Sequence, residues 1–407
     1  MGPWGYAVVA RNLAKGLRDA GHEVIIYGMQ TLGKAIPDQY GTINLPVRFT
    51  AYGEDILANY VRAYNIDLVI TICDLWHKEA QHLPNVIKAL GVAWIAHATI
   101  NSVPLTPMLG TSFKDSEWVI APSKFCEITM KEGGINKVST IPHGVDLKLF
   151  YPSETERGEM RKRLGLGDKF VLLCVQRNNS LHKNIIGVMN SYRLFLDRNP
   201  EAREKSILVM LSDAEEPASG NLLQARQLLG LKDNVRFIGF EPTEDWKDIK
   251  MLLEPDGVPH SCHFGFNEGE MRGLYNAADC LINLSSGESF GLPSLESMAC
   301  GVPQIGVNFS ATPELIEAGK AGLMTPVRAY LPQTTLSNIA IPDLIIAADH
   351  IEKMYKDVDA RKEYGKNAAE FAKNFSWDKV IPLWVELIKK VEDAIFTADY
   401  ANLRLGL

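Results

Sequence analysis

The chain is 407 residues long, with 46% hydrophobic residues, 22% charged residues and a formal net charge of −7. This length suits two domains, each with its own core, and the composition is that of an ordinary globular protein. No long basic run is present, which argues against a nucleic-acid partner. No apolar stretch reaches ~18 residues and the chain does not open on a charged and then apolar segment, so neither a transmembrane helix nor a signal peptide is expected.

The six cysteines favour a reducing compartment. They stand at positions 73, 126, 174, 262, 280 and 300, mostly in apolar runs and never as a C-x-x-C pair. These features predict a cytoplasmic protein. Cys262 and His263 lack further ligands at metal spacing, so a loop is favoured over a metal site there. Peripheral contact with a membrane and the oligomeric state are left open.

The first part of the chain alternates short β-like runs with helical patterns. A helical pattern over 7–20 ends at Gly21, and Ser123 is placed to cap a helix that runs to about residue 132. Strands are expected at 23–27, 67–72, 93–97, 118–121 and 138–141. This alternation predicts a doubly wound, parallel α/β domain over residues 1–152.

One expected element is missing from this domain. The chain enters its first helix directly through Gly2-Pro3-Trp4-Gly5, whereas a central strand normally precedes that loop. Without that strand, the backbone groups of both neighbouring strands lose their partners. We therefore expect a short sheet or a borrowed strand, and we expect a longer natural start to carry about ten more apolar residues.

The second part of the chain repeats the alternation after a polar segment that begins at Tyr151. A second α/β domain is placed at 153–376, with an apparent insertion at about 243–272 and a last helix within 377–407. Strands are expected at 170–176, 206–211, 235–239, 280–284 and 304–307, and helices at 185–199, 293–300, 343–373 and 378–397.

The segment from Gly287 to Pro303 carries most of the functional information. It follows a strand at its carboxyl end, where open α/β sheets bind ligands. The glycines allow close backbone approach, and Pro293 suits the first position of a helix. The N–H groups of Phe290, Gly291 and Leu292 therefore gather at a helix N-terminus, which suits a diphosphate.

Two acidic residues flank this helix start. Glu288 lies in the loop and Glu296 in the first helical turn, with seven residues between them. A carboxylate accepts two hydroxyl hydrogen bonds, so one residue can hold a sugar and the other a ribose.

This Glu-x7-Glu pattern resembles that of retaining glycosyltransferases of the GT-B fold, specifically glycosyltransferase family 4. The resemblance extends over nearly the whole chain, through segments 116–125, 141–146, 236–239, 275–279 and 375–378. It implies two Rossmann-like domains that face each other across a cleft, with a last helix that crosses back to the first domain. It also implies a hexosyltransferase-like enzyme whose donor is a nucleoside-diphosphate sugar, bound mainly by the second domain.

The resemblance assigns roles to the residues of the motif. Glu288 would bind donor-sugar hydroxyls, Glu296 the ribose, and the backbone of 290–292 the sugar and diphosphate. No Asp-x-Asp tripeptide is present, so no metal is demanded, and no cofactor beyond the donor is expected. The acceptor, whether carbohydrate, lipid or another molecule, is not readable.

The loop at 176–184 supplies cations. Arg177 and Lys183 follow the first strand of the second domain, where fixed positive charge can stabilise a departing diphosphate. Their spacing is one residue longer than the family pattern, which leaves His182 as an alternative to Lys183. The competing interpretation is that both cations are ordinary solvated surface residues.

Four further residues are candidates of lower rank. His97 ends the strand at 93–97, and in the resembling family a histidine near this place can contact the donor sugar; a structural role is the alternative. Gly5 lies in the loop that faces the cleft in that family and could contact a phosphate or the acceptor. His143 is expected to be structural, and Asp213 to flank the nucleotide base.

The function predicted from the sequence is retaining sugar transfer from a nucleotide sugar. A non-catalytic sugar-nucleotide binder or scaffold of the same fold is one alternative, and a sugar-nucleotide epimerase is another. A phosphorylase would need a pyridoxal lysine, and an epimerase would need acid and base carboxylates across the cleft; neither pattern stands out.

Overall fold

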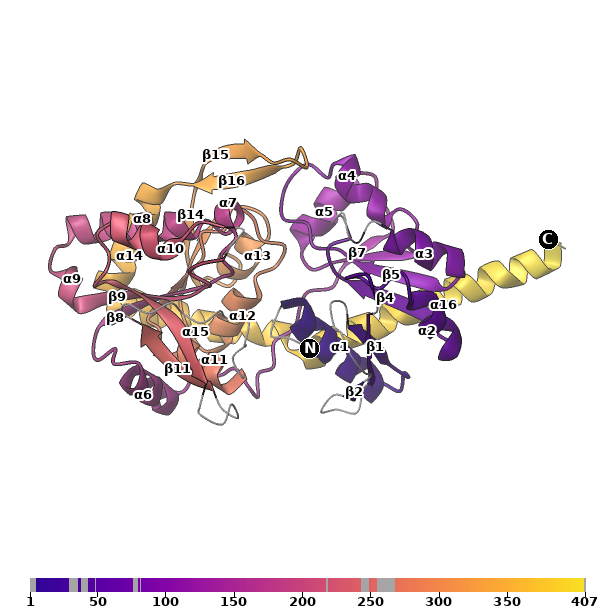
Figure 1. Cartoon of the computed structure of the whole chain (residues 1–407), viewed down its shortest axis with the longest axis horizontal. Helices are drawn as coiled ribbons and strands as arrows, with labels where there is room; N and C mark the ends of the chain where they lie inside the picture. Colours follow the sequence, from indigo (N-terminus) through magenta and orange to yellow (C-terminus); the bar gives the residue numbers. More distant parts are fainter. Residues whose placement is uncertain are drawn as a thin grey trace.

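The computed structural model describes residues 5–28, 36–37, 43–47, 49–75, 80, 82–216, 219–242, 249–254 and 268–405. They form two α/β domains that lie side by side, the first in indigo and purple and the second in magenta and orange (Figure 1). A long C-terminal helix, in yellow, passes from the second domain along the first.

The first domain contains short helices around mostly parallel strands; only β2 pairs antiparallel, with β3, among those described. Its helices are α1 (Gly5–Asp19), α2 (Leu57–Ala63), α3 (Leu83–Leu90), α4 (Pro107–Gly110) and α5 (Lys124–Glu132), with a 3-10 turn at Thr111–Phe113. Its strands are β1 (Ile25–Gly28), β2 (Ile36–Pro37), β3 (Ile43–Pro46), β4 (Leu68–Ile72), β5 (Ala93–His97), β6 (Trp118–Ala121) and β7 (Val138–Thr140). As expected, Ser123 caps α5 by accepting a hydrogen bond from the N–H of Cys126.

The strands of this domain fall into two sheets. One has the order β4-β5-β6-β7 with parallel pairing, and the other has the order β1-β3-β2. Residues 5–10 are helical, and no strand within the described ranges pairs with both β1 and β4. The sheet is therefore divided where the sequence pattern lacks its first strand. Gly2, Pro3 and Trp4 lie outside the described residues.

The second domain has a seven-stranded sheet with the order β11-β10-β9-β8-β12-β13-β14. Its strands are β8 (Phe170–Val175), β9 (Ser206–Leu211), β10 (Val235–Pro242), β11 (Ile249–Glu254), β12 (Cys280–Ile282), β13 (Gln304–Val307) and β14 (Gly322–Thr325). All neighbours are parallel except the β10–β11 pair, which lies partly in the expected insertion. The helices are α6 (Glu154–Arg163), α7 (Ser180–Lys183), α8 (Ile185–Arg198), α9 (Ala202–Lys205), α10 (Leu222–Leu228), α11 (Glu268–Ala277), α12 (Leu292–Ala299), α13 (Thr312–Ile316), α14 (Leu344–Lys356) and α15 (Val358–Ala372).

Two expectations for this domain need correction. The helix expected over 343–373 is two helices, because Asp357 leaves helical geometry and its carboxylate caps α15 through the N–H of Ala360. The polar segment after Tyr151 contains α6, whose N-cap is Ser153. A hairpin that the sequence pattern did not reveal, β15 (Val327–Pro332) with β16 (Asn338–Pro342), lies along this domain, and its turn reaches the edge of the first (Figure 1).

The C-terminal helix α16 (Trp377–Leu405) completes the core of the first domain. Val380, Trp384 and Leu387 are buried in one apolar cluster with Leu13 of α1 and Ile95 of β5. Gly16 allows the close contact of α1 with α16, because a Cβ there would lie 2.3 Å from Ile381 Cδ1. The end of the chain thus belongs to the layer that covers the first sheet.

Candidate functional site

The loop between β12 and α12, residues 283–291, lies at the carboxyl edge of the second sheet. Gly291 caps α12 with φ of +105°, a conformation that favours glycine over other residues. The N–H of Glu288 donates to Ser310 Oγ at 2.8 Å, and its carbonyl accepts from the N–H of Ala311 at 3.1 Å. These contacts fix the backbone of the loop on both sides of Glu288.

The carboxylate of Glu288 is paired with Lys183. Lys183 Nζ lies 2.6 Å from Glu288 Oε1, and Ser285 Oγ donates to the same oxygen at 2.7 Å. Gln176 supports this arrangement by donating to Ser285 Oγ at 2.7 Å and to Asn283 Oδ1 at 2.5 Å. The structure therefore joins the 176–184 loop and the 283–291 loop at a single carboxylate, through three residues that sequence reasoning missed.

The charge state of Glu288 follows from these contacts. Burial alone would raise the pKa of its carboxyl, but the charge and hydrogen bond of Lys183 outweigh burial and hold the pKa below its usual value. The Glu288 side chain thus stays ionised and ready to accept hydroxyl hydrogen bonds.

Glu296 lies one residue further from the start of α12 than expected. The helix begins at Leu292, ahead of Pro293, so Glu296 falls in its second turn. Its Oε2 accepts a hydrogen bond from the hydroxyl of Tyr275 at 2.8 Å. Burial, followed by the charge of Glu296, raises the pKa of Tyr275 well above its usual value, so the phenol remains a donor.

The two cations of the 176–184 loop have different surroundings. The Arg177 side chain is 57% exposed and pairs with Glu216 at 3.7 Å, whereas the Lys183 side chain is 22% exposed against Glu288. The structure therefore brings Lys183 into contact with the acidic residue of the motif and leaves Arg177 on the surface beside it. His182 accepts the N–H of Ser286 with its carbonyl at 2.9 Å; burial, and then Lys183, lower the pKa of its ring to about 4.

His97 and His143 form a buried pair. Their Nε2 atoms are 3.1 Å apart, so one ring donates to the other, and both Nδ1 atoms are buried without a partner within the described residues. His97 stacks on Trp384 of α16, and His143 lies 4.8 Å from the ring of Phe290, centroid to centroid. Burial lowers the pKa of His97 to about 4 and, with His97 beside it, the pKa of His143 well below its usual value. Both rings are therefore neutral at physiological pH.

Contacts across the domain boundary place the 283–291 loop against the first domain. A Cβ on Gly287 would lie 2.0 Å from the carbonyl oxygen of Asn101, so only glycine fits there. A Cβ on Gly5 would lie 3.5 Å from Leu292 Cδ1, which puts the start of α1 beside the start of α12. The predicted residues Gly5, Phe290, Gly291 and Leu292 are thus brought together between the domains.

A polar cluster on the first domain was missed by sequence reasoning. The hydroxyl of Tyr6 donates to Asp74 Oδ1 at 2.6 Å, and Thr99 Oγ1 donates to the same oxygen at 2.9 Å. Asp74 and Thr99 follow β4 and β5 at their carboxyl ends, and this shared edge was the available signal.

Of the remaining candidates, the structure places Asp213. Asp213 is buried and accepts the N–H of Glu215 at 3.0 Å, which makes it a turn-forming residue; its role beside a base stays a prediction. Cys262 and His263 lie outside the described residues. Within the described ranges, no group of three or more His, Cys, Asp or Glu side chains is arranged to hold a metal ion, and no helix is long and apolar enough to span a membrane.

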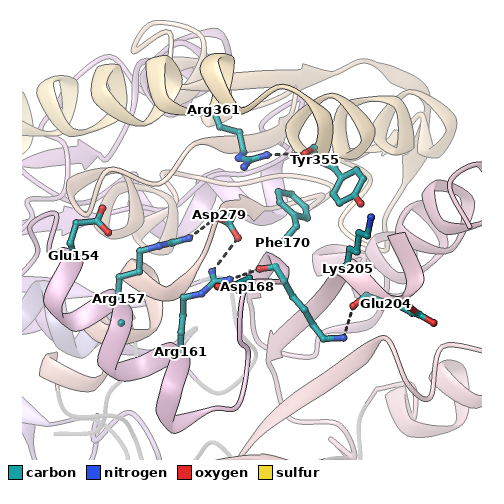
Figure 2. Close-up of a pocket in the computed structure, with 12 residues that line it drawn as sticks. Glu154, Arg157, Arg161, Asp168, Phe170, Glu204, Lys205, Asp279, Tyr355 and Arg361 are labelled. Carbon is teal, nitrogen blue, oxygen red and sulfur yellow. Dashed lines mark hydrogen bonds and ion pairs between the residues drawn. The ribbon is translucent and has the colours of Figure 1, made fainter. Parts of the chain in front are cut away.

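A pocket of about 830 Å³ opens at the opposite edge of the second sheet, where β8 begins (Figure 2). Most of its cations already have partners in the protein. Arg157 and Arg161 both bind the carboxylate of Asp279, and Lys169 Nζ donates to the carbonyl of Glu204 at 2.8 Å. These contacts tie α6 and α9 to the sheet, which indicates a structural role for this pocket.

Two facing α/β domains, with the 283–291 loop at the carboxyl edge of the second sheet, have the architecture of the GT-B fold. Solved structures of this class match the chain over nearly its whole length. Sucrose-phosphate synthase from Thermosynechococcus elongatus has a TM-score of 0.73 at 18% identity, covering 96% of this chain and 94% of its own. HepE from Anabaena, solved with UDP-glucose, has a TM-score of 0.72 at 17% identity and covers 95% and 96%.

Family models cover both domains. Residues 5–149 match Glycosyltransferase Family 4, and residues 171–334 match Glycosyl transferases group 1. The chain belongs to this glycosyltransferase family, which confirms the resemblance read from the motif.

The curated relatives share one activity in their names. D-inositol 3-phosphate glycosyltransferase from Actinosynnema mirum is 29% identical over 266 residues, which are 65% of this chain and 54% of the relative. The protein of the same name from Corynebacterium jeikeium is 29% identical over 247 residues, 59% of this chain and 48% of the relative. The chain thus spans about half the length of the curated relatives it matches.

Proposed function

We propose that this glycosyltransferase takes a nucleoside-diphosphate sugar as its donor and transfers the sugar to an acceptor hydroxyl with retention of anomeric configuration. The observation that carries the proposal is the contact of Lys183 with Glu288, held at the carboxyl edge of the second sheet and against the first domain. A fold neighbour solved with UDP-glucose supports a nucleotide sugar as the donor.

In this proposal, donor binding divides the ion pair between two parts of the ligand. Glu288 accepts hydroxyl hydrogen bonds from the sugar, and Lys183 turns to a phosphate oxygen as charge develops on the leaving diphosphate. Arg177, which is exposed at the same loop, adds a second cation, and Glu296 binds the ribose. His97 lies near the sugar in this proposal, and its hydrogen bond with His143 fixes the orientation of its ring.

The transfer step needs no side-chain nucleophile. The bond between sugar C1 and the diphosphate oxygen breaks, and a bond from C1 to the acceptor oxygen forms on the same face. The acceptor proton passes to the departing phosphate oxygen. No metal is part of this proposal, because Lys183 and Arg177 supply the positive charge; turnover that persists in excess EDTA would agree with it.

The test is an NMR assay of UDP-glucose, UDP-N-acetylglucosamine and GDP-mannose, each with and without D-inositol 3-phosphate, the compound named in the curated relatives. A product that keeps the anomeric configuration of the donor supports the proposal. A product of inverted configuration overturns retention. Formation of an epimeric nucleotide sugar without acceptor identifies an epimerase, and binding of all three donors with neither transfer nor hydrolysis identifies a non-catalytic binder.

Glu288→Ala separates catalysis from binding. Loss of the carboxylate should lower turnover by about 100-fold or more, because an interaction strengthened in the transition state is removed. Binding of UDP alone, measured by calorimetry, should persist, because UDP lacks the sugar that Glu288 holds.

A further inference from the structure

The β15–β16 hairpin and its connecting turn, residues 327–342, bridge the two domains. We call this segment the strap. It leaves the second domain after β14 and its turn reaches the first domain near α4 and α5 (Figure 1). Its outer strand is mostly exposed, whereas Ser337, Ile339 and Ala340 on the inner strand side are buried. One side of the strap therefore faces protein.

The strap contacts the first domain through hydrogen bonds. Val103 and Asn338 exchange both backbone hydrogen bonds, at 3.2 and 2.6 Å, as an antiparallel bridge. Ser102 Oγ donates to Ser337 Oγ at 2.8 Å, with both residues nearly fully buried. Each such bond contributes only about 0.5–1.5 kcal/mol net, so this attachment is specific yet breakable.

The same strap also contacts the proposed donor site. The N–H of Ala340 donates to the carbonyl of Ser286 at 2.8 Å, and the N–H of Ser286 donates to the carbonyl of His182 at 2.9 Å. Ser286 is thus held between the strap and the residue that precedes Lys183. A shift of the strap would therefore also displace the two loops that supply Lys183 and Glu288.

Two further contacts near the strap also join the two domains. Glu314 of α13 accepts the N–H groups of Lys124 and Phe125 at the start of α5, at 2.8 and 2.7 Å. The ring of Phe309 lies between Phe125 and Tyr330 of the strap, with centroids 5.8 and 5.6 Å apart. The domains are therefore joined here by a few hydrogen bonds and one aromatic contact, and relative domain motion is expected at a boundary of this kind.

This closed arrangement leaves no room for a ligand between Gly287 and the carbonyl of Asn101. We propose that the strap is a closing element: it releases the first domain for donor entry, and it re-forms the Ser102–Ser337 contact to exclude water and fix Ser286 during transfer. Ser337 is a positioning residue in this scheme. The consequence for catalysis rests on the proposed function, but the closing motion itself does not.

The experiment uses the Ser102→Cys/Ser337→Cys variant, because the two Oγ atoms are close enough for cysteines to be joined there. Oxidation should lock the strap shut, abolish UDP association in stopped-flow measurements, and narrow the distribution of dimensions in small-angle scattering. Reduction should restore both. UDP association that is equally fast in the oxidised and reduced forms would overturn donor entry by strap release.

Controls separate the strap from the disulfide chemistry and from the donor assignment. The single cysteine variants, and Ala329→Cys/Ile341→Cys, which joins paired positions within the strap, should bind UDP in both redox states. Suppose that neither form of the locking variant binds UDP, but the distribution of dimensions from small-angle scattering still narrows on oxidation. The proposed function is then wrong, and the proposal that the strap closes is supported. Identical scattering in both states overturns the strap.

A second variant tests how strap closure affects catalysis. Ser337→Ala removes one contact without blocking the cleft and should raise donor hydrolysis relative to transfer severalfold, because closure excludes water from the donor. Ser337→Thr keeps the hydroxyl and should restore the ratio. An unchanged hydrolysis-to-transfer ratio in Ser337→Ala contradicts a positioning role for Ser337.

Discussion

Lys183 Nζ lies 2.6 Å from Glu288 Oε1, although the two residues are separated by 105 positions and follow different strands. Both side chains are mostly buried, with 22% and 14% exposure. The proposed reaction uses the two charges separately, whereas in this structure they neutralise each other. The contribution of the ion pair to folding stability can therefore be measured separately from its role in catalysis.

Lys183→Met should lower the free energy of unfolding by about 3 kcal/mol, because it leaves the Glu288 carboxylate buried and unpaired. The double variant Lys183→Met/Glu288→Gln should be more stable than Lys183→Met alone. Urea denaturation of the four proteins in this cycle checks both statements. Lys205→Met, at an exposed lysine, is the control and should stay within about 0.5 kcal/mol of the parent.

Acid should destabilise the protein through the buried histidines. The pKa of His97 is about 4, against an ordinary value of 6.5, so between these pH values the unfolded chain binds a proton that the folded chain does not. Stability must then fall as pH drops from 6.5 towards 4, by about 3 kcal/mol for this group. The free energy of unfolding, measured by denaturant titration at several pH values in this window, should fall less steeply with decreasing pH in His97→Asn than in the parent. An equal fall in the two proteins would contradict the role of His97.

Gly287→Ala should block the closed state, because the added Cβ would meet the Asn101 carbonyl at 2.0 Å. We expect loss of sugar transfer with UDP binding retained, measured by product formation and calorimetry. Gly158→Ala on α6 is the matched control, since nothing lies within 4 Å of its Cβ; there alanine should raise stability by about 0.5–1 kcal/mol.

Glu314→Ala should weaken the contact between the domains, because two N–H groups at the start of α5 lose their acceptor. The expected cost is about 1 kcal/mol, similar to the loss of a helix cap. Small-angle scattering should show a larger average dimension than in the parent, and Glu317→Ala, at an exposed neighbour on the same segment, should not. Equal dimensions in both variants would argue against Glu314 as a contact that holds the domains together.

Much of the fold and part of the site were predictable from sequence. The 280–300 region was readable because a buried strand, a glycine loop and a Pro-started helix follow one another within it. The Lys183–Glu288 pairing was not, because nothing local specifies which strand ends meet. The strap was missed because its outer strand is exposed and ends in Pro332, so it lacks the alternation of a half-buried strand.

The α6 helix shows that a usable signal can be overlooked. Its sequence is mostly charged and shows no apolar face, so the pattern alone predicts a polar segment at the domain boundary. Yet Ser153 precedes acidic residues at 154 and 156, and the last turn is basic at 161–163, which is the charge order that complements a helix dipole. Packing on α11 then decides the helix where hydrophobic periodicity cannot.

Trp384→Ala should unfold the first domain more than the second. This side chain is 2% exposed and fills the cluster between α16 and β5, so its truncation should cost about 3–5 kcal/mol. Hydrogen exchange should accelerate in β4, β5 and β6 while β8 and β9 stay protected. Uniform acceleration in both domains would contradict this assignment.

The position of α16 also affects how the protein is made. The sheet face formed by Ile95 and Ile120 is covered by residues 380–391, which leave the ribosome only after the whole second domain has been translated. At about 5–20 residues per second, that delay lasts roughly ten seconds to a minute. The domain synthesised first is thus the last to bury its apolar surface, and nascent chains in that interval are natural clients for chaperones.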